Sequence, residues 1–410
     1  MYYPTKTVGK KRGTVMIYTD NAATTPISPS AAQTFTKCLN EVYGNPSSLH
    51  SIGQKAAEVL FEARQTVAQC LNCQPREIYF TSGGSEADNQ AIRSAAHAGK
   101  KKGKLHIIST SVEHHAVLHT LDRLKDEGFE VQLLEVGETG LVTPQQVADA
   151  IREDTCLVSV MYANNEIGTV MPIAEIGEIC RARGVTFHTD AVQAAGHLHI
   201  DVSKQNIDML SLSGHKFHGP KGVGVLYARK GVALESLIDG GAQERGKRAG
   251  TENIPAIAAM AQALKEACSE MDEVARQETA IRDRIIQGLS EIPHSILNGD
   301  RDKRLPNNVS FCFEGIEGES LLLMLDEKGI CGSSGSACTS GSLDPSHVLL
   351  AIGRIHEIAH GSLRLSLSKY NTMEEAEYII KTVPGVVEYL RSFSPLWKDK
   401  VSGKNPFILK

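Results

Sequence analysis

Two residues of the sequence stand where a nucleophile could operate. Lys216 follows an apolar stretch in SGHKFHGPKG. Burial beside apolar groups lowers the pKa of a lysine, which makes its amine available as a nucleophile. Cys338 stands in a segment of small polar residues, 332–342, and an exposed thiol there would be an oxidation liability unless it had a use. We therefore interpret Cys338 as a reactive thiol; a solvated lysine and an incidental cysteine in a linker are the alternatives.

Polar residues cluster just beyond the carboxyl ends of predicted strands, which is the edge where ligands bind in open α/β sheets. Four such clusters occur, at 81–86, 164–166, 190–193 and 213–216. Each of them alone could be an ordinary loop. Together, after four different strands, they indicate one shared site.

Two of these clusters suggest what the site binds. The first contains Gly83 and Gly84 before a predicted helix, whose free N–H groups would face an anion such as phosphate. An ordinary helix cap at Ser85 is the alternative. Asp190 would be a partly buried carboxylate in need of a cationic partner. A protonated pyridine nitrogen would serve, because protonation makes that ring an electron sink, although a helix cap explains Asp190 equally well.

The elements that must position these residues alternate between helices and short β-branched strands, which predicts an α/β fold with a mainly parallel sheet. The expected helices are 55–71, 85–98, 114–127 and 172–183. The expected strands are 77–81, 105–109, 156–161, 185–189, 208–213 and 223–228. A long helix at 255–290 would then lead to a smaller α+β domain, and the tail 397–410 is expected to be loosely held. That domain is expected to contain strands 307–313 and 362–367 and helices 318–328 and 372–392.

Composition excludes several classes of protein. With 410 residues, 41% hydrophobic and 22% charged, the chain is typical of folded proteins with two or three domains. A net charge of −5 argues against a nucleic-acid partner, and no apolar run is long enough to cross a membrane. Nine scattered cysteines indicate a reducing, cytoplasmic location. The spacing of histidines and cysteines matches no structural metal motif.

An ordered set of motifs extends from about residue 18 to residue 395. The motifs are YTDNAATTP (18–26), YGNPSSLH (43–50), FTSGGSEADN (80–89), SVEHHAV (111–117), ANNEIG (163–168), HTDAVQAAG (188–196), SGHKFHGPKG (213–222), GGAQERGKRAGTEN (240–253), SSGSACTSGSLDPSHVL (333–349) and GSLRLSLS (361–368). Together they resemble the cysteine desulfurases of the NifS/IscS type, which are pyridoxal-phosphate enzymes of the aminotransferase class V group.

The resemblance implies a pyridoxal-phosphate-dependent transferase of fold type I. Its large cofactor-binding α/β domain would comprise 18–265, and a small α+β domain would comprise 1–17 and 266–410. The implied reaction converts L-cysteine to L-alanine and leaves the sulfur on Cys338 as a persulfide. The implied partners are a second copy of the chain and an iron–sulfur scaffold protein or another sulfur acceptor, where a cluster could touch Cys338 transiently.

The resemblance also assigns residues to pyridoxal 5'-phosphate and to the substrate. Lys216 would hold the cofactor and move the substrate's α-proton, and His114 would stack on the ring and transfer protons. Asp190 would pair with the ring nitrogen. Asn165 and Arg364 would bind the substrate carboxylate, for which a guanidinium is well suited. The other implied cofactor-binding residues are Gly84, Ser85, Gln193, Ser213, Gly214, His215 and, from the partner subunit, Thr251; Asn165 is also among them.

Other activities fit the sequence less well. Selenocysteine lyases and the second desulfurase group have a shorter loop with a different cysteine motif. A class V transaminase needs no thiol in such a segment. A non-catalytic sulfur-relay protein would not need both Lys216 and Cys338, and a metal hydrolase would have to rely on histidine pairs that lack an HExxH motif.

Overall fold

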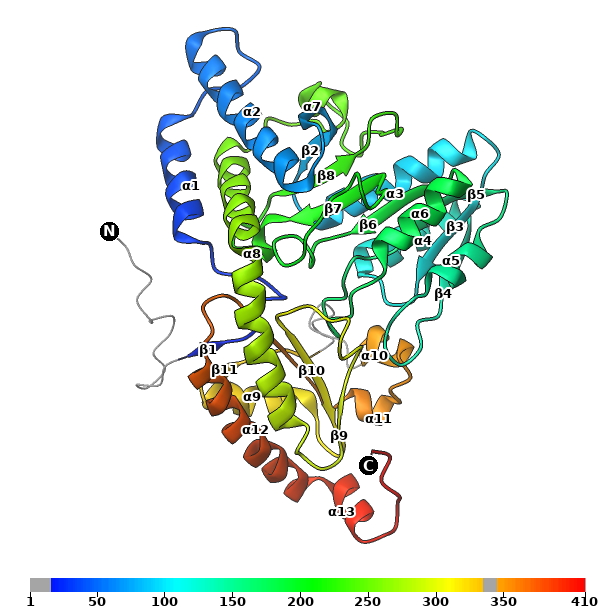
Figure 1. The fold of residues 1–410 in the computed structure, drawn as a ribbon, viewed down its shortest axis with the longest axis vertical. Helices are drawn as coiled ribbons and strands as arrows, with labels where there is room; N and C mark the ends of the chain where they lie inside the picture. Colours follow the sequence, from blue (N-terminus) through cyan, green and yellow to red (C-terminus); the bar gives the residue numbers. More distant parts are fainter. Residues whose placement is uncertain (1–15, 335–344, 410) are drawn as a thin grey trace.

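The computed structural model describes residues 16–334 and 345–409, so that Cys338 lies outside the described residues. Its largest sheet has seven strands, which in spatial order are β2 (Ile78–Thr81), β8 (Gly224–Ala228), β7 (Met209–Ser213), β6 (Thr186–Asp190), β5 (Thr155–Ser159), β3 (His106–Thr110) and β4 (Glu130–Leu134) (Figure 1). Neighbouring strands are parallel from β7 to β4, whereas β8 is antiparallel to both β7 and β2. This arrangement confirms the predicted mainly parallel sheet.

Both faces of this sheet are buried under helices. Ile107 and Ile108 are neighbours in β3, yet they belong to different hydrophobic clusters because successive side chains of a strand point to opposite faces. One face is covered by α3 (Gly84–Lys100) and α4 (His115–Asp126). The other is covered by α2 (Ser51–Leu71), α5 (Pro144–Ala150), α6 (Ile173–Arg183) and the start of α8 (Ile254–Leu289). As expected for strands covered on both faces, every residue of β3, β5 and β7 is buried.

The predicted elements of this region occur within a few residues of their expected bounds, but several elements were missed. β4 was not predicted because it lies at the sheet edge, where Glu130 and Gln132 are exposed and its pattern is not that of a buried strand. The short helix α5 and the N-terminal helix α1 (Pro29–Glu41), which packs against α8, were also missed.

A smaller α+β unit follows α8. Its antiparallel sheet consists of β12 (Ser362–Ser366), β10 (Asn308–Phe313) and β9 (Ser295–Leu297), and a second, parallel pair consists of β1 (Ile17–Tyr18) and β11 (Ile330–Cys331). Helix α12 (Met373–Phe393) packs beside the second half of α8, and α9 (Gly318–Glu327) packs against α12. Thr372 and Glu375 form a capping box at the start of α12. Short helices complete the unit: α10 (His347–Ala351), α11 (His356–Ala359) and α13 (Pro395–Val401).

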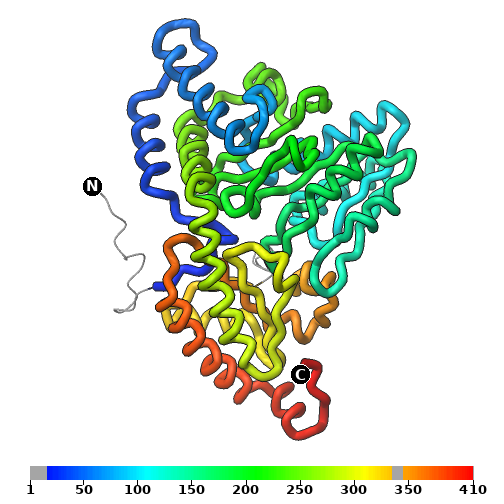
Figure 2. Tube along the Cα trace, viewed as in Figure 1, coloured from blue at the N-terminus to red at the C-terminus, as the bar shows by residue number. Residues whose placement is uncertain are grey.

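Helix α8 belongs to both hydrophobic cores and joins them (Figure 2). Ala259 and Leu264 pack in the core of the large sheet, whereas Ile281 and Leu289 pack in the core of the smaller unit. The boundary expected after residue 265 falls inside this helix, and Ile17 packs in the smaller core. A continuous helix therefore fixes the two units relative to each other. Among the described residues, no helix has both the length and the apolar character that crossing a membrane requires.

The C-terminal tail is anchored, which corrects the expectation that its polar sequence leaves it loosely held. Glu314 has a fully buried side chain that accepts hydrogen bonds from the backbone N–H groups of Ile408 and Leu409, each at 2.8 Å. The Lys400 ammonium, 3% exposed, lies 2.8 Å from the same carboxylate. No local pattern pointed to this contact, because Glu314 is distant along the chain from the tail that it binds.

Replacing Glu314 should release the tail. Glu314→Gln removes one of the two carboxylates beside the buried Lys400 ammonium; the other, Glu357, lies at 2.9 Å and remains. We therefore expect the free energy of unfolding to fall by about 1–3 kcal/mol. Urea unfolding measures that loss, and hydrogen exchange at Ile408 and Leu409 should become faster. Lys404→Ala is the matched control, because Lys404 forms an exposed ion pair with Asp399 and its loss should cost at most about 0.5 kcal/mol. Equal losses in the two variants would contradict the anchoring role.

Candidate active site

A cavity of about 340 Å³ lies at the carboxyl edge of the large sheet, and β12 of the smaller unit contributes to its wall. This volume suits a small-molecule ligand. The cavity brings together residues from all four polar clusters that were expected to meet. The predicted site residues that line it are Gly84, Ser85, His114, Asn165, Asp190, Gln193, Ser213, His215, Lys216 and Arg364.

Lys216 is placed in the cavity by the 3-10 helix η2 (Gly214–Lys216), which follows β7 directly. Its Nζ donates hydrogen bonds to the carbonyl oxygens of Ala22, at 2.6 Å, and Ala23, at 2.8 Å. Both carbonyls belong to the segment after β1. Two backbone acceptors thus hold the amine where the sequence predicts a nucleophile.

Asp190 ends β6, and its carboxylate is buried in the cavity wall. Its Oδ1 accepts a hydrogen bond of 2.9 Å from the backbone N–H of Val192. Burial raises the pKa of Asp190 to about 6, although the Val192 N–H and the Lys216 ammonium oppose that change. Ionising a buried carboxylate costs free energy unless a positive charge lies close to it. Asp190 therefore favours a cationic ligand, which agrees with its predicted pairing with a protonated ring nitrogen.

His114, rather than its neighbour His115, lines the cavity. The His114 ring caps α4, where its Nδ1 accepts a hydrogen bond from the Ala116 N–H at 3.1 Å. Burial and then the nearby Lys216 ammonium lower the pKa of His114 to about 4, so the ring is neutral at pH 7. The His115 ring packs instead against His347, with ring centroids 4.6 Å apart.

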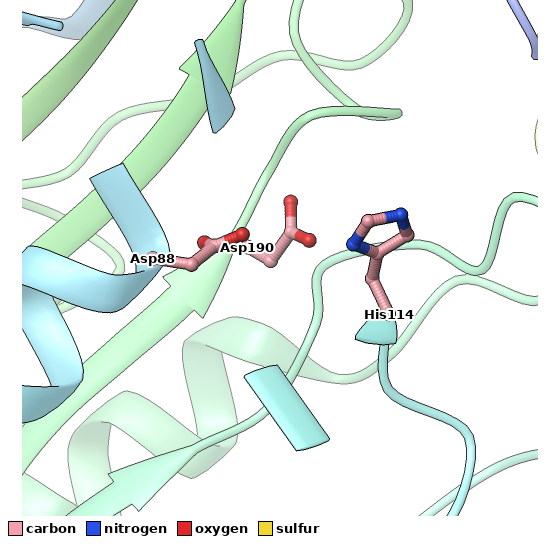
Figure 3. Close-up of side chains that lie close together, drawn as sticks. All are labelled: Asp88, His114 and Asp190. Atoms are coloured by element: carbon pink, nitrogen blue, oxygen red, sulfur yellow. The ribbon is translucent and has the colours of Figure 1, made fainter. Parts of the chain in front are cut away.

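A second carboxylate that the sequence did not single out lies beside Asp190. Asp88 of α3 is buried, and single side-chain atoms of Asp88, His114 and Asp190 lie within 4.8 Å of one another (Figure 3). Such a group could surround a metal ion, but Asp190 and His114 are also the residues predicted to meet a cofactor ring. Asp88 stands one helical turn after Gly84, and this spacing was the available signal that both face the same site.

The start of α3 forms a cradle at another wall of the cavity. Its first N–H groups and the positive end of the helix dipole suit an anion. A Cβ atom on Gly84 would lie only 2.6 Å from Val192 Cγ2, so glycine lets the helix begin this close to the loop after β6. Ser213 adds a hydroxyl, and the His215 Nδ1 lies 3.1 Å from the Thr24 hydroxyl.

Arg364 reaches the cavity from β12 and is only 2% exposed. Its guanidinium donates to the Asp20 carboxylate at 2.9 Å and to the Asn165 carbonyl at 3.1 Å. The Arg364 Nε is buried and has no hydrogen-bond partner among the described residues. The group is therefore fixed in orientation and retains the capacity to bind a carboxylate. Asp20, which the sequence did not single out, lies within the YTDNAATTP motif.

Three predicted residues do not line the cavity. Gly214 packs closely against the chain, and a Cβ atom there would lie 3.0 Å from the Pro220 carbonyl oxygen. Thr251 is exposed just before α8. Cys338 lies outside the described residues, but Ser333, shortly before it, donates from its backbone N–H to the Arg364 carbonyl at 3.0 Å. The described residues that precede Cys338 in the sequence therefore contact a residue of the cavity wall, Arg364.

Comparison with known proteins places this fold and site in a family. The aminotransferase class-V pattern matches residues 17–379. A relative from Methanosarcina thermophila named cysteine desulfurase IscS is 53% identical over 93% of this chain and 94% of its own length. A solved NifS-like protein is 38% identical, covers 92% of this chain and 100% of its own and superposes with a TM-score of 0.86. Another, described as SspA in complex with cysteine, is 38% identical, covers 87% and 99% and has a TM-score of 0.76.

The chain therefore belongs to the aminotransferase class-V family and, within it, to the cysteine desulfurases of the NifS/IscS type. This confirms the family resemblance and the fold class predicted from the sequence. The roles of single residues remain predictions.

Asp190→Asn should stabilise the cofactor-free protein at neutral pH. An unfolded aspartate ionises near pH 4, whereas Asp190 in the folded chain ionises near pH 6. As the pH rises through this window, the folded wild type holds its proton longer and loses stability, which the neutral amide does not. We expect the variant to be about 1–3 kcal/mol more stable in urea unfolding at pH 8, and the gain to vanish at pH 4. Asp122→Asn, at an exposed position, is the control, and a less stable Asp190→Asn at pH 8 would contradict this account.

Proposed function

We propose that the protein is a cysteine desulfurase that uses pyridoxal 5'-phosphate to convert L-cysteine to L-alanine and passes the sulfur to an acceptor for iron–sulfur cluster assembly. The observation that carries this proposal is the meeting of Lys216, Asp190 and Arg364 at one cavity. An amine, a buried carboxylate and a guanidinium are the groups needed for an aldehyde cofactor with a ring nitrogen and an amino-acid substrate. The relatives named as desulfurases, and the related structure described as holding cysteine, support the same substrate.

The residues around the cavity fit pyridoxal phosphate. Lys216 offers an amine for the aldehyde, and Asp190 offers a buried carboxylate for the ring nitrogen. The start of α3 offers N–H groups for the phosphate, in the cradle that Gly84 leaves open. Gln193, whose Nε2 donates to the Ala22 carbonyl at 3.0 Å, would bond the phenolic oxygen. When bound, this cofactor supplies an electron sink that stabilises the carbanion left when the substrate loses its α-proton.

The substrate would be held and deprotonated by residues from both units of the chain. Arg364 would bind the α-carboxylate of L-cysteine, assisted by Asn165, and its rigid partners keep the guanidinium oriented. Lys216 Nζ would take the α-proton. His114 would accept or return protons, because its ring is neutral at pH 7.

Cys338 would receive the sulfur. Its thiolate attacks the substrate sulfur, an S–S bond forms, and the C–S bond breaks with its electron pair left on the substrate's β-carbon. Protonation of that carbon and return of a proton to the α-carbon give L-alanine. The described residues on either side of Cys338 support this role. Ser333 pairs with Arg364, and the Ser346 hydroxyl bonds to the buried Glu166 carboxylate. The next residue, His347, lies 3.0 Å from the Glu113 carbonyl, beside His114.

Two substitutions separate cofactor binding from sulfur transfer. Lys216→Ala should abolish the visible absorbance of the lysine-bound cofactor and the production of sulfide from L-cysteine. Cys338→Ala should keep that absorbance but lose sulfide release by several orders of magnitude, since the thiol is the sulfur acceptor. Absorbance spectra and a sulfide assay measure the two effects.

Mass spectrometry after L-cysteine treatment should find one added sulfur on Cys338. Cys331→Ser is the matched control, because Cys331 lies in β11 near the same segment and should not be needed. A wild-type protein that stays colourless with pyridoxal phosphate would overturn the cofactor assignment. Wild-type sulfide release by Cys338→Ala would overturn only the role of the thiol.

We also propose that the enzyme works as a homodimer. Helices α1 and α2 and the turn between them expose large apolar side chains to solvent; Leu49 is 93% exposed and Tyr43 77%. Such a patch is typical of an interface. Ile254 packs on the inner side of these helices, and because the exposed Thr251 shortly precedes it, we expect Thr251 to lie near the patch. The exposed apolar residues of this surface are Leu39, Tyr43, Leu49, Ile52 and Phe61.

Leu49→Asp should weaken the dimer at least about tenfold, because it introduces a charge into the apolar interface. Sedimentation or light scattering over a range of concentrations measures the shift toward monomer. Leu323→Asp is the control, since Leu323 is 70% exposed on α9, away from this surface. A monomeric wild type, or an equal shift in both variants, would contradict the proposed interface.

A further inference from the structure

Two carboxylates are buried side by side at the cavity. Asp190 lies between Asp88 and His114 in Figure 3, and the side chains of Asp88 and Asp190 belong to residues only 1% and 5% exposed. Two carboxylates this close in a site shielded from water cannot both ionise without a compensating charge. One of them must therefore hold a proton, or a cation must lie near both.

The groups that face Asp88 offer no positive charge. His188 of β6 lies 3.6 Å from Asp88 Oδ1, but burial lowers the pKa of its ring to about 3, so it is neutral. Ser211 of β7 offers a hydroxyl. Glu113, before α4, is another buried acid, and burial raises its pKa to about 8. Lys216, the nearby cation, favours ionisation of Asp190.

We propose that Asp88 is a positioning residue that stays protonated beside Asp190, so that the pair carries a single negative charge and that charge stays on Asp190. Asp88 Oδ1 is buried and accepts no hydrogen bond from the described residues, so an anion there would lack its usual compensation. Burial and the charge of Asp190 raise the pKa of Asp88 well above its usual range, although the Ser211 hydroxyl opposes that change.

Under the proposed function, a neutral Asp88 beside an ionised Asp190 would help to bind the cofactor. An ionised Asp88 would make Asp190 more basic and draw a proton from the cofactor's ring nitrogen to the carboxylates. A neutral Asp88 leaves Asp190 as the only anion for that nitrogen and can support it with a hydrogen bond. Only this step depends on the proposed cofactor; the proton on Asp88 is a property of the chain itself.

The proton can be tested without cofactor. A protonated carboxyl group has an infrared C=O stretch above the amide I band. The difference spectrum between cofactor-free wild type and Asp88→Asn at pH 7 should contain one such band, and Asp122→Asn should leave it unchanged. Absence of the band would overturn the proposal. If the wild type binds no pyridoxal phosphate, the proposed function fails, and the infrared result still decides the state of Asp88.

Cofactor affinity tests the positioning role. Cofactor-free protein is titrated with pyridoxal phosphate and followed by absorbance. Asp88→Asn, neutral and of equal shape, should bind within about threefold of wild type, whereas Asp88→Ala should bind about 5–50-fold more weakly. If Asp88→Asn bound the cofactor as weakly as Asp190→Asn, a negative charge on Asp88 would be needed for binding, which would contradict the proposal. If Asp88→Ala bound the cofactor with wild-type affinity, Asp88 would not support the site. If Asp88→Ala fails to fold, the infrared band still tests whether Asp88 is protonated, and the affinity of Asp88→Asn still tests whether a neutral side chain suffices.

Discussion

The arrangement of the cavity follows from one constraint, the burial of a carboxylate at the end of β6. Asp190 is held there by the sheet register and by the Val192 N–H, in a position where ionisation is costly. Such a group is stable as an anion only if positive charge is brought to it. Lys216 follows the neighbouring strand β7 and brings an ammonium group close to Asp190. The His114 ring is neutral and does not repel a cationic ligand. The parallel order of the strands is what gathers these residues at one edge.

The segment after β1 connects that edge to the smaller unit. Its Ala22 and Ala23 carbonyls hold Lys216, and its Asp20 carboxylate holds Arg364. Because one short stretch of backbone contacts both the nucleophile and the guanidinium, the distance between them does not depend on α8 alone. The strand before this segment, β1, pairs in parallel with β11 and so ties the segment to the smaller unit.

The large sheet was predictable because each inner strand is buried on both faces and is bounded by turn residues. Lys216 and Asp190 were likewise visible in the sequence, since their places follow strand ends. Asp88 and Asp20 were not singled out, because their roles depend on partners that are distant in the sequence. Asp88 lies beside Asp190, and Asp20 forms an ion pair with Arg364. The anchored tail was missed for the same reason. Local patterns predict elements and strand ends, whereas pairs between distant charges appear only in the folded chain.

The acids around the cavity also bear on what it can bind. Glu113 and Glu166 do not line the cavity, but each stands next to a lining residue, His114 for Glu113 and Asn165 for Glu166. Burial raises the pKa of Glu113 to about 8 and that of Glu166 to about 7, so these two acids carry less negative charge near neutral pH than exposed glutamates do. The proposed ligands bring negative charge of their own, a phosphate at the start of α3 and a carboxylate at Arg364. If every buried acid were ionised, the cavity would repel both. Protonated acids let the site keep its hydrogen-bonding groups while it accepts anions, and they leave Asp190 as the carboxylate on which a cationic ring nitrogen can be placed.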